Sequence, residues 1–233
     1  MGDNTVRHLG VIMDGNRRWA RQHMFAVMRG HERGVDTFID LCEWCENAGI
    51  PYLTVYAFST ENWKRSQQEV ADLFRLMRRF FVDEIHRCIE MGVRVVCIGN
   101  YDRLSAEDRE VIRKAEEVTK DCDRLYLQIA LSYGGRDEIV RAAEAYVRDV
   151  LEGKAKAGSL TEEAFGSYLY TAGVPDMDLV IRTGGDQRLS NFFPWQSTYA
   201  DLWFTDTLWP DFSEALLKEA LDYYKTVKIN KGK

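Results

Sequence analysis

HLGVIMDGNRRWA, residues 8–20, is the stretch that decides the fold of this 233-residue chain. Its apolar part, residues 9–13, predicts a short buried strand. Asp14, Gly15 and Asn16 predict a turn, and a helix should begin at about Arg17. In α/β proteins, ligands bind where such a turn leads from a strand into a helix.

The polar residues of this turn suit a phosphate site. Asp14 can hold a magnesium ion through its carboxylate while phosphate oxygens take other positions on the metal. Gly15 lets the backbone approach an anion closely, and Asn16 can cap a helix whose free N–H groups favour phosphate. Arg18 adds a bidentate donor. The tripeptide alone is more typical of an ordinary turn, so the prediction depends on the motifs that accompany it.

Apolar runs and amphipathic stretches alternate along the rest of the chain. We expect further strands over 52–58, 93–98, 125–131 and 179–182, and helices over 35–48, 66–91, 106–119, 136–151 and 212–224, with a short helix capped by Thr161. This alternation predicts an α/β fold with a central, largely parallel sheet covered on both faces. We expect one domain spanning residues 1–233.

Composition narrows the class of protein. A hydrophobic fraction of 45% and a charged fraction of 29% are ordinary for a globular protein, and the formal charge of −6 argues against nucleic-acid binding. Neither a membrane span nor a secretory signal is recognisable, so we expect a cytoplasmic protein. The five cysteines are odd in number and irregularly spaced, which favours reduced thiols. Cys42 and Cys45 form a CxxC within an apolar helical pattern and are expected to be structural.

Polar clusters follow two further strands. Residues 59–65 read STENWKR, and Arg182 and Arg188 flank a Thr-Gly-Gly loop with Ser190 close by. Two guanidinium groups, a hydroxyl and exposed amides can bind a diphosphate. The alternative is a solvated basic loop, because Asp186 could pair with either arginine. The carboxyl ends of parallel strands share one edge of a sheet, so the clusters should converge with Asp14.

Apolar residues near these clusters could serve a hydrocarbon. Over 66–91 they recur three or four residues apart, which indicates either a core-facing stripe or the lining of an apolar channel. Aromatic residues are concentrated over 192–209, where ordinary packing is the simpler interpretation. Anion sites beside an apolar pocket would suit a substrate with a diphosphate head and a hydrocarbon tail.

Taken together, these segments resemble the cis-prenyltransferase family, which includes the undecaprenyl diphosphate synthases. The resemblance covers nearly the whole chain and rests on five segments in order: HLGVIMDGNRRWA (8–20), GH (30–31), YAFSTENWKR (56–65), YGGR (133–136) and DLVIRTGGD with RLSNF (178–192).

The resemblance implies a homodimer with an apolar tunnel in each subunit. It implies that isopentenyl units are added in cis to an allylic diphosphate, which is farnesyl or geranylgeranyl diphosphate. The implied cofactor is Mg²⁺. It also implies a peripheral membrane contact for product release. Asp14 and Asn62 are the implied catalytic residues, and Asp14 and Asp201 the implied metal ligands. The implied substrate-binding residues are Gly15, Asn16, Arg17, Arg18, Trp19, His31, Ser59, Thr60, Glu61, Trp63, Arg65, Arg182, Arg188 and Ser190. The proton acceptor stays open among Asp14, the diphosphate, and Asn62 with Ser59.

Four departures from the family pattern stand out. Val27 replaces an arginine common at the allylic diphosphate, which leaves Arg29 as a substitute, and Asp201 replaces a glutamate. Gln187 stands where some members have histidine, and residues 225–233 lack an Arg-rich ending. Ala57 is small where early-stopping members tend to be bulky, and residues 66–91 lack the insertion of very long-chain enzymes. We therefore expect a medium-chain product near undecaprenyl.

Three alternatives stay open from the sequence. The chain could be a short-chain cis-prenyltransferase, or a subunit of a heteromeric enzyme that needs a partner. Such partners generally lack the metal-binding aspartate and the diphosphate arginines, which are present here. An aspartyl phosphohydrolase would need a second acid two residues after Asp14, where this chain has Asn16.

Overall fold

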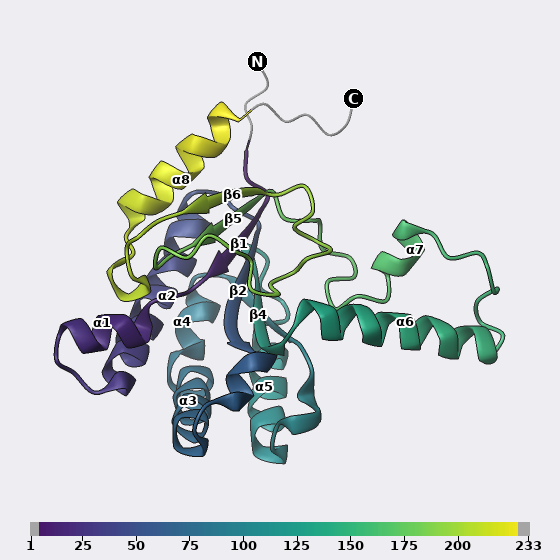
Figure 1. Cartoon of the computed structure of the whole chain (residues 1–233), viewed down its shortest axis with the longest axis horizontal. Coiled ribbons are helices and arrows are strands. Elements are labelled where there is room, and N and C mark those ends of the chain that lie inside the picture. Colours follow the sequence, from purple (N-terminus) through teal and green to yellow (C-terminus); the bar gives the residue numbers. More distant parts are fainter. Residues whose placement is uncertain (1–4, 228–233) are drawn as a thin grey trace.

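The computed structural model describes residues 5–227 and is built on a six-stranded sheet (Figure 1). All neighbouring strands are parallel, in the order β3-β4-β2-β1-β5-β6. The strands are β1 (His8–Ile12), β2 (Tyr52–Ser59), β3 (Val93–Ile98), β4 (Leu125–Tyr133), β5 (Leu179–Arg182) and β6 (Asp201–Phe204). The predicted α/β fold with a parallel central sheet is confirmed. Within residues 5–227, every helix is too short or too polar to cross a bilayer.

The helices surround the sheet unevenly. They are α1 (Asn16–Gln22), α2 (Val27–Asn47), α3 (Gln67–Arg79), α4 (Ile85–Glu90), α5 (Ala106–Thr119), α6 (Gly135–Leu151), α7 (Glu162–Gly166) and α8 (Glu214–Thr226). Helices α2, α3, α4, α5 and α8 bury their apolar residues in one cluster against the sheet. Helix α6 instead projects away from the body and carries α7 beside it (Figure 1).

Period-2 alternation along the strands separates the two faces of the sheet. Leu9 and Val11 of β1 are fully buried against the helical layer. Ile12 faces the other side, where Phe192 and Phe193 from the segment after β5 pack in a second cluster. Irregular chain thus covers much of this second face, so the loop that follows Arg182 is held directly against the sheet.

Three elements differ from the sequence prediction. Helix α2 begins at Val27 instead of residue 35, because its first turns contain Gly30 and Gly34 in place of apolar residues and so lack a visible stripe. The long helix predicted over 66–91 is interrupted by a π-helical turn, Phe80–Glu84, between α3 and α4. Strand β6 was missed because it is a four-residue edge strand with no residue fully buried.

The chain changes direction across the sheet between β1 and β5. Strand β2 lies on one side of β1 and β5 lies on the other side. Ile12 of β1 is in register with Arg182 of β5. Such a switch point leaves a crevice at the carboxyl ends of the two strands, where ligands bind in open α/β sheets. Asp14 and Arg182 flank this crevice.

Candidate active site

Backbone contacts fix Asp14 at the end of β1. The hydroxyl of Thr183 accepts a hydrogen bond from the Asp14 amide at 3.0 Å and donates one to the Asp14 carbonyl at 2.7 Å. Gly15 then adopts φ 122°, and a Cβ there would lie 2.9 Å from Leu208 Cα. Only glycine suits this conformation, and it allows a tight turn between β1 and α1.

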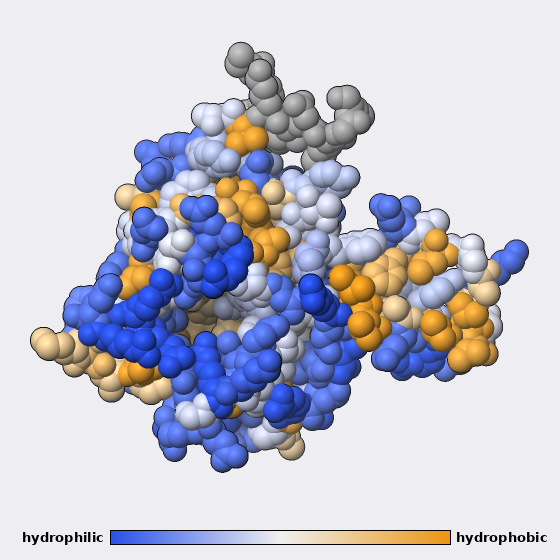
Figure 2. Space-filling view, in the orientation of Figure 1, coloured by the Kyte–Doolittle hydropathy of each residue, from blue (hydrophilic) through white to orange (hydrophobic). Residues whose placement is uncertain are grey.

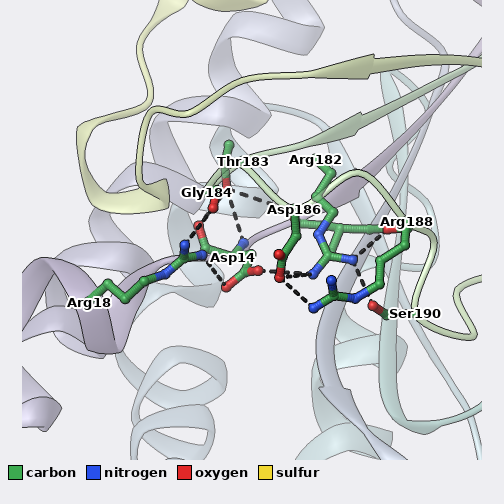
Figure 3. A network of polar contacts seen from close by, with 9 residues as sticks. Asp14, Arg18, Arg182, Thr183, Gly184, Asp186, Arg188 and Ser190 are labelled. Carbon is green, nitrogen blue, oxygen red and sulfur yellow. Dashed lines mark hydrogen bonds and ion pairs between the residues drawn. The ribbon is translucent and has the colours of Figure 1, made fainter.

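Each carboxylate oxygen of Asp14 faces an arginine (Figure 3). Oδ1 lies 3.1 Å from Arg18 Nη2, and Oδ2 lies 3.0 Å from Arg182 Nη2. Arg18 also donates to the Gly184 carbonyl at 2.6 Å. The predicted convergence of the first and last clusters is therefore present, with Asp14 between their arginines.

Arg182 is the buried member of this group, since its side chain is only 5% exposed. It donates to Ser190 Oγ at 2.6 Å and to the Arg188 carbonyl, and it shares Asp186 with Arg188. Asp186 thus pairs with both arginines, at 3.2 and 2.6 Å. A buried guanidinium with several acceptors is held rigidly, whereas Arg188 is 63% exposed, so its pair with Asp186 can be exchanged for a ligand.

The second cluster is a 3₁₀ turn, Thr60–Lys64, directly after β2. A capping box fixes it, because Asn62 Oδ1 accepts from the Ser59 amide at 3.1 Å. Glu61 accepts from Asn191 Nδ2 at 3.2 Å, which ties this turn to the loop after β5. Burial would raise the pKa of Glu61, but hydrogen bonds from its own amide, Ser59, Asn191 and Thr60 outweigh it, and the pKa is lowered.

Two polar pockets and one apolar cavity meet at these clusters. The first polar pocket, about 450 Å³, is lined by Asp14, Ser59, Glu61, Asn62, Arg65, Arg182 and Ser190 among others. The second, about 370 Å³, is lined by residues 13–18 with Arg21, His31 and Arg65. Behind them lies an apolar cavity of about 130 Å³. Met13, Asn16 and His31 line all three, so the polar and apolar spaces adjoin.

Helices α2 and α3 and strands β2 and β4 form the apolar cavity. Leu73, Phe74 and Met77 of α3 line it, together with Phe80 and Phe81 of the π turn. The apolar stripe over 66–91 therefore both packs in the core and lines a cavity. Ala57 of β2 lies where the cavity meets the first polar pocket, at an irregularity in the pairing of β2 with β4. Such bulges often lie beside active sites.

His31 of α2 borders all three spaces and is buried. Burial, and secondarily the charges of Arg65 and Arg17, lowers its pKa to about 4. Its Nε2 and the Oδ1 of Asn16 are both buried, and neither has a partner in the part of the chain that is described. At neutral pH the imidazole is uncharged, so one ring nitrogen can donate a hydrogen bond and the other can accept one.

Four predicted site residues make contacts within the protein: Trp19, Trp63, Thr60 and Arg17. Trp19 Nε1 donates to Asp211 Oδ1 at 2.7 Å, and Trp63 Nε1 donates to Ser132 Oγ at 3.0 Å, so both indoles brace the site from outside. Thr60 packs against the backbone at Gly134. Arg17 lines the second polar pocket and pairs with Glu69 at 3.7 Å.

Asp201 lies apart from Asp14 within one chain. Asp201 begins β6 and is in register with Leu179, at the amino edge of the sheet, whereas Asp14 follows the carboxyl edge. Asp14 lies five residues beyond Leu9, the β1 residue paired with Leu179, which is roughly 16 Å along the strand. Asp201 and Asp14 of one chain therefore cannot share a metal ion. Burial raises the pKa of Asp201.

Asn191 was not among the predicted site residues, although the structure gives it a central place. Its side chain accepts from the Arg136 amide at 2.9 Å and donates to Glu61, while its carbonyl accepts from the Gly135 amide at 2.9 Å. Ser190 and Asn191 both have positive φ, 50° and 67°. Its sequence signals were its place in the RLSNF segment, residues 188–192, and the tolerance of asparagine for this conformation.

Comparison with known proteins assigns the chain to a family. The model of the undecaprenyl diphosphate synthase family matches residues 12–232. The chain belongs to the undecaprenyl diphosphate synthase family. An isoprenyl transferase of Clostridium perfringens is 45% identical over 222 residues, covering 95% of this chain and 88% of that protein. An isoprenyl transferase of Aquifex aeolicus is 42% identical over 226 residues, covering 97% of this chain and 95% of that protein.

Two solved structures resemble this member of the undecaprenyl diphosphate synthase family. Lavandulyl diphosphate synthase from Lavandula x intermedia, in complex with dimethylallyl diphosphate, matches with a TM-score of 0.95 and 33% identity, covering 98% of this chain and 99% of that one. A probable undecaprenyl diphosphate synthase from Campylobacter jejuni matches with a TM-score of 0.82 and 37% identity, covering 99% and 100%. The chain is therefore a cis-prenyltransferase, as its motifs predicted.

Proposed function

We propose that this chain lengthens an allylic diphosphate, farnesyl or geranylgeranyl, by condensing it with isopentenyl diphosphate, to a medium-chain product near undecaprenyl. The observation that carries the proposal is the junction of two polar pockets with an apolar cavity at Met13, Asn16 and His31. A substrate with a diphosphate head and a hydrocarbon tail needs these two environments in contact. We treat residues 1–233 as one domain for this function.

In this proposal, different arginines bind the two diphosphates. Arg18 and Arg65 line the second polar pocket and bind the allylic diphosphate, with the helix start at Gly15 and Asn16. Arg182, Arg188 and Ser190 bind isopentenyl diphosphate. The isopentenyl double bond attacks the allylic carbon, the bond from that carbon to the diphosphate oxygen breaks, and loss of a proton restores an alkene. Fixed guanidinium groups stabilise the charge that develops on the departing diphosphate.

Asp14 fits a magnesium ion in its chemistry. Magnesium is usually bound through one or two carboxylates together with substrate phosphates and water, and both polar pockets contain Asp14. Bound there, Mg²⁺ would neutralise charge on a diphosphate. The same carboxylate orients Arg18 and Arg182, so it positions one arginine for each substrate.

Asn62 acts in this proposal by positioning. Its Oδ1 already accepts from the Ser59 amide, which leaves its NH₂ group to donate into the first polar pocket. An amide that donates cannot take up the proton that the reaction releases. We therefore keep Asp14 or the diphosphate itself as the acceptor.

Turnover by the purified chain tests this function. With farnesyl diphosphate, labelled isopentenyl diphosphate and Mg²⁺, we expect a medium-chain product, and Asp14→Asn should abolish most of it because the carboxylate is lost. Asp206→Asn, outside both polar pockets, is the matched control. Activity only after a second polypeptide is added would contradict the proposal.

A short-chain product is the second candidate, favoured by the TM-score of 0.95 to a lavandulyl diphosphate synthase. Ala57 distinguishes a medium-chain product from a short-chain product. Its small side chain leaves the passage into the apolar cavity open, which favours the medium-chain product. We expect Ala57→Leu to shift the products to shorter chains, while Ala57→Ser keeps them. Products that end after one condensation in the unmodified chain would refute the medium-chain proposal.

We also propose that two copies associate through the projecting α6. Val140, Val147 and Leu151 are 57%, 54% and 82% exposed on this helix. Their spacing of seven and four residues places them in one stripe. An exposed apolar stripe of this kind marks an interaction surface, and a second copy of the same helix would cover it. We place this homodimer in the cytoplasm, which suits its five free cysteines.

A further inference from the structure

An arginine outside both polar pockets lies against the tryptophan of the second cluster. The guanidinium carbon of Arg103 lies 4.5 Å from the centre of the Trp63 ring, which is a cation–π contact. Arg103 follows β3 and Trp63 follows β2, and the sheet is parallel, so both lie at the edge where Asp14 follows β1. Arg103 itself lies outside the lining of both polar pockets, so its influence on a substrate would pass through Trp63.

The backbone on both sides of Arg103 is fixed. Arg103 ends the 3₁₀ turn Tyr101–Arg103. Arg109 donates to the carbonyls of Asp102 and Leu104 at 3.3 and 3.2 Å, and the side chain of Leu104 is buried. The Arg103 side chain therefore starts from a defined position at the ends of the strands.

The charge of Arg103 is left for the ring. Over residues 5–227, no ion pair and no side-chain hydrogen bond involves its guanidinium, and its neighbour Asp102 pairs with Arg141 instead. An arginine that is not held by a carboxylate can keep its planar guanidinium on an aromatic face. The contact with Trp63 is therefore what holds this exposed side chain in place.

Trp63 is also held from the interior. Its Nε1 donates to Ser132 Oγ at 3.0 Å. Its ring packs against Phe74 of α3 and Phe58 of β2, with centroids 5.2 and 5.1 Å away, and both phenylalanines line the apolar cavity. Trp63 therefore fastens the second cluster to the wall of the cavity, and Arg103 adds a contact from an exposed side chain.

The turn that Trp63 fastens carries two residues of the first polar pocket. Asn62 lies directly before Trp63 and Arg65 lies two residues after it, and both line that pocket. Figure 2 shows a hollow near the centre of the molecule, with hydrophilic surface on its rim and apolar surface inside, as expected for polar pockets in front of an apolar cavity. A displacement of about 1 Å in such a site can lower turnover about 100-fold.

We propose that Arg103 is a positioning residue for the prenyl transfer. Its contact with Trp63 fixes the turn Thr60–Lys64 and thereby the placement of Asn62 and Arg65. This inference rests on the proposed function, in which Asn62 positions the reacting groups and Arg65 binds the allylic diphosphate.

Steady-state kinetics of the full chain test this role. Arg103→Ala should lower kcat/KM for farnesyl diphosphate at least about fivefold, and Arg103→Lys should recover part of the loss because an ammonium also binds an aromatic face. Arg94→Ala is the matched control. The Arg94 guanidinium lies 5.3 Å from the centre of the Tyr126 ring, a contact of the same kind near the amino end of β3, and its loss should leave kcat/KM unchanged.

A double-mutant cycle shows whether Arg103 acts through the ring. In a Trp63→Leu background, Arg103→Ala should lower kcat/KM by a further factor of less than about two, because the contact is already gone. Quenching by acrylamide follows the contact without substrate. The Trp63 fluorescence, isolated by subtracting the spectrum of the matching Trp63→Phe chain, should be quenched more strongly in Arg103→Ala because the ring loses its cover.

Four results would overturn the role of Arg103. They are an alanine variant with wild-type kcat/KM, a lysine variant no better than the alanine variant, an undiminished loss in the Trp63→Leu background, and unchanged quenching. Thermal melting checks folding, and Arg103→Met, which keeps the apolar stem without the charge, replaces an alanine variant that melts early. A wild type without turnover would refute the proposed function together with this role, whereas an active wild type that tolerates Arg103→Ala refutes this role alone.

Discussion

The guanidinium of Arg182 is almost fully buried, yet it touches Asp14, Asp186 and Ser190. Burial of a charge is unfavourable unless it is paired and hydrogen-bonded, and here both Nη atoms are paired or hydrogen-bonded, whereas the buried Nε has no partner among the described residues. A buried arginine on the last residue of a strand can shift little when a ligand arrives. In the proposed function, Arg182 therefore presents a fixed donor at the edge of the first polar pocket.

Replacing Arg182 with lysine tests that function. Lysine keeps the charge but loses the planar fork that reaches Asp14 and Ser190 together. We expect the KM for isopentenyl diphosphate to rise about 10- to 100-fold, equivalent to about 1.4 to 2.8 kcal/mol. Arg188→Lys, at an exposed side chain, should change it much less. Equal effects of the two substitutions, measured by steady-state kinetics, would argue against a special place for Arg182.

His31 makes the free energy of unfolding depend on pH, and the lowered pKa gives the direction of this dependence. Its pKa is lowered to about 4 in the folded chain, against an ordinary value of 6.5. Between these values the unfolded chain binds a proton that the folded chain does not. The free energy of unfolding should therefore fall as pH drops from 6.5 toward 4, by about 2–3 kcal/mol from His31.

Urea unfolding at several pH values measures this slope. His31→Asn should flatten it compared with the wild type, because the asparagine does not titrate. Some slope should remain, since burial also lowers the pKa of His8. Identical slopes in wild type and variant would show that His31 does not titrate as described.

At the scale of elements, two helices meet at a glycine. A Cβ on Gly30 of α2 would lie 2.1 Å from the Asn16 carbonyl oxygen and 3.1 Å from Ala20 Cβ. The close approach of α1 to α2 is therefore possible only without a side chain at residue 30. It also holds Asn16 at the junction of the three pockets.

Gly30→Ala should force α1 away from α2. We expect a loss of about 1–3 kcal/mol in the free energy of unfolding, as for other overpacked sites, and reduced turnover because Asn16 moves. Gly166→Ala in α7 is the control, since a Cβ there meets nothing within 4 Å. Chemical denaturation of both variants checks the difference, and a stable Gly30→Ala chain would contradict this packing.

Elements with strong apolar periodicity could be predicted from sequence, and elements with weak apolar periodicity could not. Strands β1 to β5 are short apolar runs and were recognised. Strand β6 is half exposed, and the start of α2 has glycine where an apolar stripe would show. In the candidate site, strand ends placed Asp14 and Arg182 correctly at one edge of the sheet. Directions of single side chains, such as those of Trp19 and Trp63, depend on tertiary partners that local sequence does not contain.

For the whole molecule, the projecting α6 gives a test of association. Val147→Asp places a charge in the exposed apolar stripe and should shift the protein from dimer to monomer in light scattering, because burying an unpaired charge is costly. Val118→Asp, on a residue that is 53% exposed on α5, should leave the dimer intact. A wild type that is monomeric at micromolar concentration would rule out the proposed homodimer.

The pairing of β1 with β5 also has a consequence for how the protein is made. Leu9 lies beside Leu179, so one edge of β1 waits for a partner 170 residues later in the chain. At about 5–20 residues per second, a ribosome needs roughly 10 to 35 s to deliver it. During that time the nascent chain exposes an apolar strand edge, and the crevice between Asp14 and Arg182 cannot exist. A newly synthesised chain should therefore depend on chaperones until residue 182 has left the ribosome.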